Sequence, residues 1–269
     1  GVQTCALPIS GKMVTEAIPT RVFALYRIVT SKKNISRSDL QELMEPKEIY
    51  EGTSYFSTIL KTATELKLVD IQDNYVTAIV PKEELKTIED LRTYIISKLD
   101  NYEEEQFYKC TNAIVNLDEK IYKYSSISDN EMLNYLSEKS DQQITAPMAR
   151  GWRFWAQFLG FGYMNGFVFL PNAYVFVKDV IKLMDLEKKK EYQIDDFMTR
   201  FNQYGKILSG NPKSEKNLNI AFSSALRQLH ENGEISLKYV SDKGSKWILY
   251  PSNEAFNDPI GAIIYKGVK

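Results

Sequence analysis

The chain has 269 residues, of which 43% are hydrophobic and 12% aromatic, and its formal net charge at pH 7 is −1. This length is sufficient for two or three small domains, each with its own core. The balanced charge excludes a strongly basic nucleic-acid binder. No apolar run reaches the length of a bilayer-spanning helix, so we expect a soluble protein without membrane contact.

The first nine residues, GVQTCALPI, resemble the in-frame translation of a common sequencing-library adapter. They lack the basic start and the long apolar run of a secretory signal. We therefore expect residues 1–12 to be a non-native leader, with the natural sequence beginning near Met13. Because Cys5 belongs to this expected leader, Cys110 is left as the single native cysteine. A single cysteine excludes a disulfide framework and favours a reducing, cytoplasmic setting.

Charge is distributed unevenly along the chain. Residues 17–80 carry eight basic and eight acidic side chains, whereas residues 81–143 carry eight and fourteen, a net charge of −6. Residues 144–190 carry seven and three, a net charge of +4, and residues 191–269 carry ten and nine, a net charge of +1. Any polyanion site is therefore expected after residue 144 or on one face of the first domain.

The first predicted unit covers residues 17–81. A helix is expected from about Thr20, whose hydroxyl can cap it, and Ser36 or Ser38 can cap a second helix. A third helix with an apolar stripe follows, and then two strands that meet at a turn formed by Asp73-Asn74. The outward side chains of the third helix that are candidates for DNA contact are Ser57, Thr58 and Lys61.

Residues 82–102 are predicted to form a helical linker, and residues 103–171 a second unit with the same order of elements. Trp152 and Trp155 fall on the apolar stripe of its third helix, which leads into a hairpin around Asn165-Gly166. The basic side chains on another face of this helix, which are candidates for phosphate contact, are Arg150 and Arg153.

Residues 172–251 are predicted to form the third unit, and residues 252–269 a short tail that includes a possible strand, GAIIY. Its third helix is expected to end before Gly233, and two strands up to Pro251 form the hairpin, with its tip at Lys243-Gly244-Ser245. The candidate DNA contacts are Lys216, Asn219, Ser223, Arg227 and Gln228 on the helix, and Lys238, Lys243 and Lys246 on the hairpin.

Three repeats of a helical stretch followed by a hairpin predict a mainly α fold with small β-hairpins, of the α+β class. Helix followed by wing is the order of a winged helix, and the layout resembles that of prokaryotic tandem winged helix-turn-helix proteins. The chain also resembles DpdG-like accessory proteins of prokaryotic DNA-modification and phage-defence clusters. The segments that carry this resemblance are IPTRVFALYRIV, SRSDLQELMEP and GWRFWAQFLGFGY.

Few side chains suggest catalysis. His230 is the single histidine, and its place in the last turn of a helix favours capping of free carbonyl groups. Cys110 is expected to be a buried small residue in an apolar helix. Because neither a zinc ligand set nor a nucleophile–base pair can be assembled, we expect no catalytic residue, no metal and no cofactor.

The outward residues of the three third helices are the sharpest functional candidates. A helix in the major groove reads base edges with Arg, Asn, Gln and Ser, while Lys neutralises phosphate. The alternative is that these side chains form ordinary solvated helix faces. The pairs Arg150–Trp152 and Arg153–Trp155 also suggest a stacking platform for single strands, although tryptophans at helical spacing are more often core residues.

The sequence therefore favours a non-enzymatic cytoplasmic protein that binds double-stranded DNA in a regulatory, defence or DNA-processing system. The alternative is a winged-helix scaffold that binds partner subunits, with the acidic middle of the chain facing a basic partner. A net charge near zero keeps both roles open, and both rest partly on analogy between folds.

Overall fold

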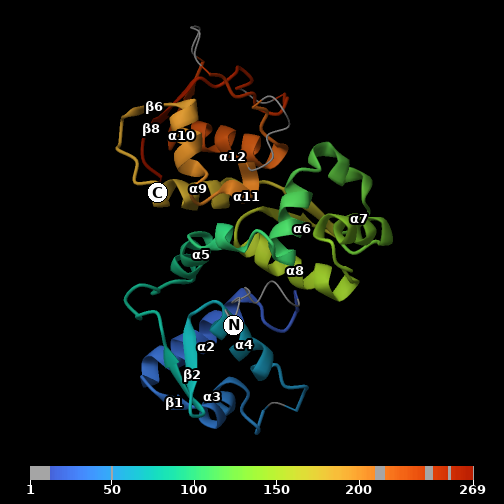
Figure 1. The fold of residues 1–269 in the computed structure, drawn as a ribbon, viewed down its shortest axis with the longest axis vertical. Helices are drawn as coiled ribbons and strands as arrows, with labels where there is room; N and C mark the ends of the chain where they lie inside the picture. Colours follow the sequence, from blue (N-terminus) through green and yellow to red (C-terminus); the bar gives the residue numbers. More distant parts are fainter. Residues whose placement is uncertain (1–12, 50, 210–215, 240–244, 254–255, 269) are drawn as a thin grey trace.

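The computed structural model describes residues 13–49, 51–209, 216–239, 245–253 and 256–268. Helices dominate, and the described strands form small antiparallel sheets of two or three strands, which confirms the α+β prediction. The molecule is elongated, with the first unit at one end and the third at the other (Figure 1). Among the described residues, no helix has both the length and the apolar character needed to cross a membrane.

The first unit contains three helices and a three-stranded sheet. Its elements are α2 (Pro19–Lys32), β1 (Ile35–Ser36), α3 (Arg37–Met44), α4 (Phe56–Glu65), β2 (Val69–Gln72) and β3 (Tyr75–Ala78). The strand order is β1-β3-β2, with Val76 of β3 opposite both Ile35 and Ile71. The hydrophobic sides of α2 and α4 pack together against this sheet.

Two capping predictions for the first unit had different outcomes. Ser36 caps α3, since its Oγ accepts a hydrogen bond from the Asp39 N–H at 3.1 Å. Thr20 does not cap α2, because that helix begins at Pro19 after Ile18 and has no side-chain cap. Proline suits this position because its missing N–H would have no partner within the helix. At the predicted turn, Asp73 and Asn74 both have positive φ, as a tight hairpin requires.

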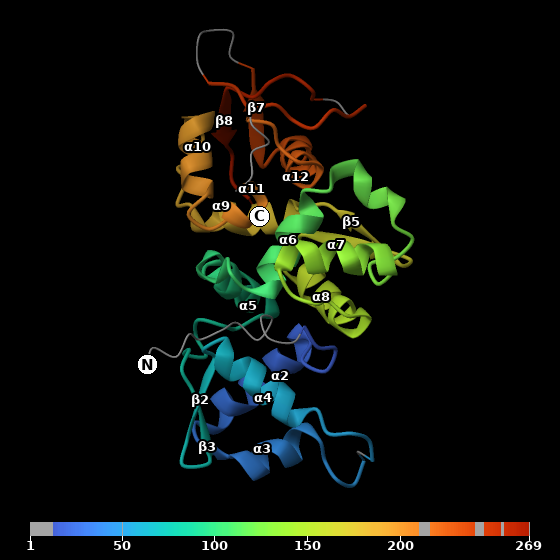
Figure 2. The ribbon, with the colours of Figure 1, turned by 45° about the vertical axis from the view of Figure 1, so that its right-hand side comes forward.

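The linker forms the helix α5 (Ile88–Ile96) and the 3-10 helix η1 (Leu99–Tyr102). Thr87 and Asp90 form a capping box that sets the start of α5. This helix packs against α2 of the first unit and α9 (Tyr174–Leu183) of the third unit. It therefore lies between two units that are far apart in the sequence (Figure 2).

The second unit lies beside these elements. It contains α6 (Gln106–Val115), the 3-10 helix η2 (Asp118–Lys123), α7 (Asn130–Ser140), α8 (Ala146–Phe158), β4 (Gly162–Asn165) and β5 (Val168–Pro171). Trp152 and Trp155 of α8 are 1% and 3% exposed, which confirms that they belong to the core. The indole of Trp152 donates to Thr111 Oγ1, and that of Trp155 donates to the carbonyl of Ala17.

The third unit continues from α9 to the last strand. It contains β6 (Glu191–Gln193), α10 (Ile194–Phe201), α11 (Lys206–Ser209), α12 (Ile220–Glu231), β7 (Ile235–Lys238) and β8 (Ala262–Tyr265). Gly233 has a φ of 70°, so it ends α12 as predicted. His230 acts differently from the prediction that it caps carbonyl groups, because its Nδ1 accepts a hydrogen bond from the Leu237 N–H at 3.2 Å.

The prediction that β7 pairs with a strand ending before Pro251 was wrong. Its partner is β8, which comes from the expected tail and lies at the centre of a sheet with the order β6-β8-β7. The segment before Pro251 makes only isolated bridges, such as Trp247 with Ile260. The apolar strand Ala262–Tyr265 buries more hydrophobic surface at the centre of the sheet than the partly polar segment 245–250 would.

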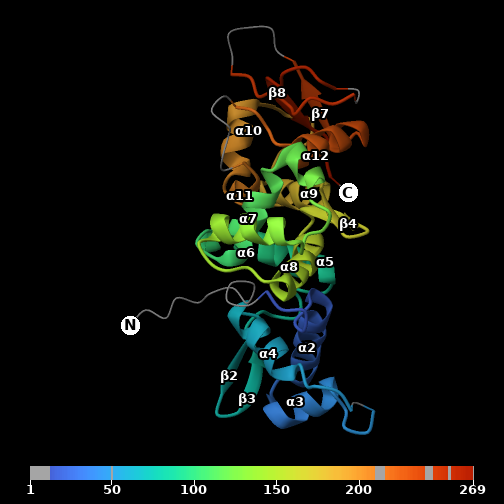
Figure 3. The ribbon, with the colours of Figure 1, turned by 90° about the vertical axis from the view of Figure 1, so that its right-hand side faces the viewer.

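The first and third units have the same arrangement of strands, since β1-β3-β2 corresponds to β6-β8-β7. They differ in the connection between the last two strands. In the first unit this connection is the tight turn at Asp73-Asn74, whereas in the third unit it comprises residues 239–261. The third unit (Figure 3) therefore carries a long insertion next to its third helix.

Cys110 lies fully buried on α6, as predicted, and burial raises the pKa of its thiol to about 12. Because the thiolate is the reactive form, we expect iodoacetamide at mildly alkaline pH to leave Cys110 unmodified in the folded chain. After unfolding in urea, the same reagent should modify it fully. Peptide mass spectrometry reports on Cys110 separately from Cys5, and rapid modification under native conditions would contradict the burial of this thiol.

Candidate functional site

The third helix of the first unit, α4, has an open outer face. Ser57 is exposed and Thr58 is half-buried, and the side chain of Lys61 is 71% exposed. Lys61 Nζ lies 3.6 Å from a carboxylate oxygen of Glu65, one helical turn away, and exposed pairs of this kind exchange readily with other partners. The three predicted residues of this helix thus lie together on an accessible surface.

The third helix of the second unit, α8, is accessible on one side only. Arg150 is exposed, and Arg153 is half-buried with its guanidinium 5.0 Å from the ring centre of Phe154. The neighbouring side is closed by the start of the described chain, because a Cβ on Gly151 would lie 2.1 Å from the Met13 carbonyl oxygen. Because Trp152 and Trp155 are both buried, they do not form a stacking platform beside the two arginines.

In the third unit, α12 corresponds to the predicted third helix, and it contradicts the predicted orientation. Asn219, Ser223 and Arg227 were expected to point outward but are buried, and Gln228 is half-buried. Asn219 is the N-cap of α12, where its Oδ1 accepts the Phe222 N–H at 2.9 Å. The polar residues of this face have partners within the same chain.

Much of that face is covered by what we call the covering segment, the described residues 247–253 and 256–257. The Arg227 guanidinium donates at 2.8 Å to the carbonyl oxygens of Phe256 and Tyr250 and to Asn257 Oδ1. Ser223 Oγ accepts the Tyr250 N–H, also at 2.8 Å. The long connection between β7 and β8 thus occupies the surface that α4 leaves open in the first unit.

The predicted lysines of the third unit are engaged with other side chains. Lys216 is exposed and contacts the Asp195 carboxylate at 3.0 Å, and Lys238 lies 3.5 Å from Glu191. Lys246 Nζ lies 4.8 Å from the ring centre of Tyr239. Lys243 lies outside the described residues. The expected convergence of free basic side chains is therefore absent from the described part of the third unit.

Asp195 organises this region through several contacts. Partial burial works against its charge, but hydrogen bonds from Trp247 Nε1, Ser245 and Lys216 hold the pKa of the carboxyl below its ordinary value. The bond from Trp247 Nε1 to Asp195 Oδ1 is 2.8 Å long. Because the carboxylate stays ionised, it keeps the indole of Trp247 in one orientation.

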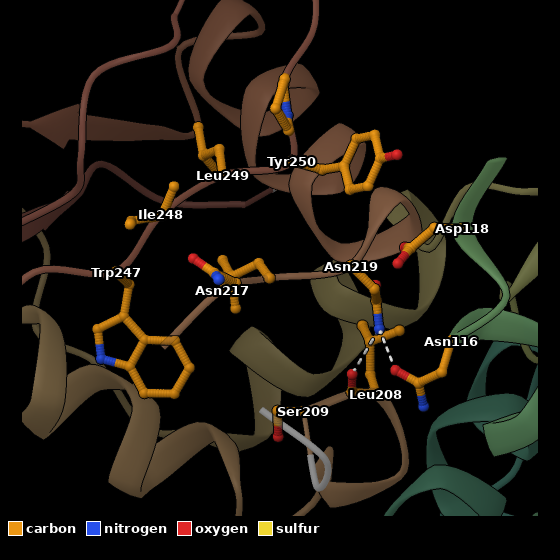
Figure 4. Close-up of a pocket in the computed structure, with 12 residues that line it drawn as sticks. Asn116, Asp118, Leu208, Ser209, Asn217, Asn219, Trp247, Ile248, Leu249 and Tyr250 are labelled. Atoms are coloured by element: carbon orange, nitrogen blue, oxygen red, sulfur yellow. Dashed lines mark hydrogen bonds between the residues drawn. The ribbon is translucent and has the colours of Figure 1, made fainter. Parts of the chain in front are cut away.

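A cavity of about 260 Å³ lies where the second and third units meet (Figure 4). Its walls come from the end of α6 and the start of η2, from the end of α11, from the residues just before α12, and from the covering segment. The residues that line it are Asn116, Asp118, Leu208, Ser209, Asn217, Leu218, Asn219, Trp247, Ile248, Leu249, Tyr250 and Pro251.

The polar wall of the cavity is built around the start of α12. Asp118 is 3% exposed, has a left-handed φ of 53°, and its Oδ1 accepts the Ile220 N–H at 2.9 Å. Asn219 Nδ2 donates to the Leu208 carbonyl at 2.9 Å and to Asn116 Oδ1 at 3.3 Å, as the dashed lines in Figure 4 show. Amide and carboxylate groups therefore hold the second unit against the third.

Sequence reasoning missed this cavity because its walls come from four separate segments. Asn116 and Asp118 belong to the second unit, and Asn219 was expected to face solvent. No spacing rule connects these positions. Among the residues that the structure describes, no group of three or more His, Cys, Asp or Glu side chains comes together as a metal ion would require.

A protein-family model described as DpdG-like matches residues 12–243, which is most of the chain. This confirms the narrower of the two resemblances seen in the sequence. No curated protein and no solved structure matches the chain.

Proposed function

The chain belongs to the DpdG-like family, and from this premise we propose that it is a non-enzymatic accessory protein of a prokaryotic DNA-modification or phage-defence system. We propose that it binds duplex DNA through its first unit. The observation that carries this assignment is that α4 keeps its outer face open, whereas the covering segment hides much of the same face of α12.

The arrangement of the first unit supports a winged-helix mode of binding. Three helices precede a hairpin, and β1, between the first two helices, pairs with the last strand of that hairpin. In a winged helix, the third helix enters the major groove and the hairpin lies along the adjacent backbone. The first unit also forms a free end of the molecule, where a duplex can approach without meeting the other units (Figure 1).

The side chains of α4 have suitable chemistry for this role. The hydroxyls of Ser57 and Thr58 can donate to or accept from base edges, and Lys61 can exchange Glu65 for a phosphate. The first unit has no net charge, so we expect modest affinity that falls as salt rises.

The test compares two lysine reversals that change charge equally. Lys61→Glu should weaken duplex binding roughly tenfold at low salt, because attraction to a phosphate becomes repulsion. Lys246→Glu, on the hairpin side of the third unit, should leave binding nearly unchanged. Fluorescence anisotropy with a labelled duplex over a salt series measures both effects. If Lys246→Glu weakened duplex binding more than Lys61→Glu, the DNA-binding site would lie in the third unit instead.

A partner-binding role for the first unit is the second candidate, and a specific surface favours it. Leu43 and Tyr75 are 50% and 49% exposed at the edge of an open cavity of about 470 Å³ between α3 and β3. Exposed apolar side chains beside a cavity are typical of protein interfaces. Two results together would replace DNA binding by this role. The wild-type chain would fail to bind duplex DNA at low salt, and it would co-purify with products of neighbouring genes. The variant Tyr75→Asp would lose this co-purification.

A further inference from the structure

We propose that the cavity between the second and third units is a binding site for a small, uncharged heteroaromatic compound that carries N–H or amide groups. This inference is independent of DNA binding, since none of the cavity residues belongs to the first unit. It rests on the size of the cavity, the absence of basic side chains among the described residues that line it, and the way its aromatic walls are held.

The size of the cavity sets the scale of the ligand. A volume of about 260 Å³ lies just below the usual range for ligand pockets, and suits a compound of one or two rings. Leu208, Leu218 and Leu249 supply apolar surface. Asn116, Asp118 and Asn219 place polar groups on one side, and Asn217 and Ser209 add polar groups elsewhere in the wall (Figure 4). An apolar body with a few converging polar groups is the usual composition of a small-molecule site.

The described lining offers an anion no positive partner. Its residues include the carboxyl of Asp118 and the amides of Asn116, Asn217 and Asn219, but no Lys or Arg. The start of α12 would otherwise attract a negative group, yet Asp118 already accepts the Ile220 N–H and Asn219 accepts the Phe222 N–H. A carboxylate or phosphate would therefore lose its hydration without gaining a positive partner. An amide oxygen can accept two hydrogen bonds, so the amides of Asn116 and Asn217 instead favour a ligand that donates hydrogen bonds.

The aromatic walls are held in place before any ligand binds. Trp247 is fixed by the hydrogen bond from its Nε1 to Asp195, and the Tyr250 hydroxyl bonds to Glu119 of the second unit. The Tyr250 N–H is bound to Ser223 Oγ. Rigid flat walls lower the entropy cost of binding and favour a flat ligand that stacks on them.

The test uses two pairs of probes that differ in charge: nicotinamide and nicotinate, which match in size, and uracil and orotate, which is uracil with an added carboxylate. The chain has three tryptophans, and Trp152 and Trp155 are buried in the second unit, so a ligand in the cavity should change the emission of Trp247 selectively. We expect nicotinamide or uracil to quench saturably, and the carboxylates to bind at least about tenfold more weakly. Trp247→Phe should abolish the fluorescence change.

A charge-reversal variant completes the experiment with the full chain. Asn217 is exposed at the cavity, so Asn217→Lys adds a cation with little risk to folding. It should bring nicotinate to at least equal affinity with nicotinamide, whereas the matched variant Asn134→Lys, exposed on α7, should keep the wild-type preference. Absence of saturable quenching by both uncharged probes would overturn the proposal. Equal binding of neutral and anionic probes to the wild type, or an unchanged preference in Asn217→Lys, would overturn it as well.

Discussion

Replacing Arg227 by alanine is expected to lower the free energy of unfolding by about 3 kcal/mol or more. The guanidinium is 3% exposed and donates to Phe256 O, Tyr250 O and Asn257 Oδ1 at 2.8 Å. Removal leaves these acceptors without the charged donor and opens a void beneath the covering segment. Urea unfolding followed by circular dichroism measures the loss.

Arg200→Ala is the matched control for this prediction. Arg200 lies on α10 of the same unit, but its side chain is 42% exposed and contacts Asp196 at 3.3 Å, one turn away. Pairs of this kind contribute about 0.5 kcal/mol or less. Losses of similar size in the two variants would contradict the structural role of Arg227 and revive its predicted role as a base-reading side chain on an open face.

Replacing Arg92 by leucine is the second change with a large expected effect, and it should lower the free energy of unfolding by about 3 kcal/mol. Arg92 of the linker helix α5 donates at 2.6 Å from Nε to Oδ2 of Asp179 on α9, and the Asp179 side chain is 2% exposed. Without Arg92, a buried carboxylate loses its closest charge partner. Leucine retains much of the apolar contact, so the loss reports mainly on the ion pair.

Lys182→Met tests whether the position of the partner, rather than charge alone, determines this loss. Lys182 contacts the other oxygen of the same carboxylate at 3.3 Å, but its side chain is 41% exposed. We expect Lys182→Met to lower the free energy of unfolding by less than about 1 kcal/mol. Chemical denaturation of both variants provides the comparison, and an equal effect would show that Arg92 does not fasten the linker to the third unit.

Local sequence patterns predicted much of the fold because they act over short distances. The apolar stripe of α8 placed Trp152 and Trp155 in the core, and Ser36 capped α3 through a bond to a residue three positions away. Asp73-Asn74 marked a tight turn because these residue types tolerate positive φ. In each case the residues that determine the structure are neighbours in the chain, so the sequence contains the whole interaction.

Tertiary structure alone decided which polar residues are accessible. Helical spacing places Ser223 and Arg227 on one face of α12, but it cannot reveal that Tyr250, Phe256 and Asn257 return to cover that face. It also cannot show that the strand at 262–265 displaces the nearer segment as the partner of β7. The cavity at Asn116 and Trp247 depends on the same long-range contacts. Periodicity identifies the face of a helix that is polar, whereas burial depends on segments distant in the sequence that only the folded chain brings together.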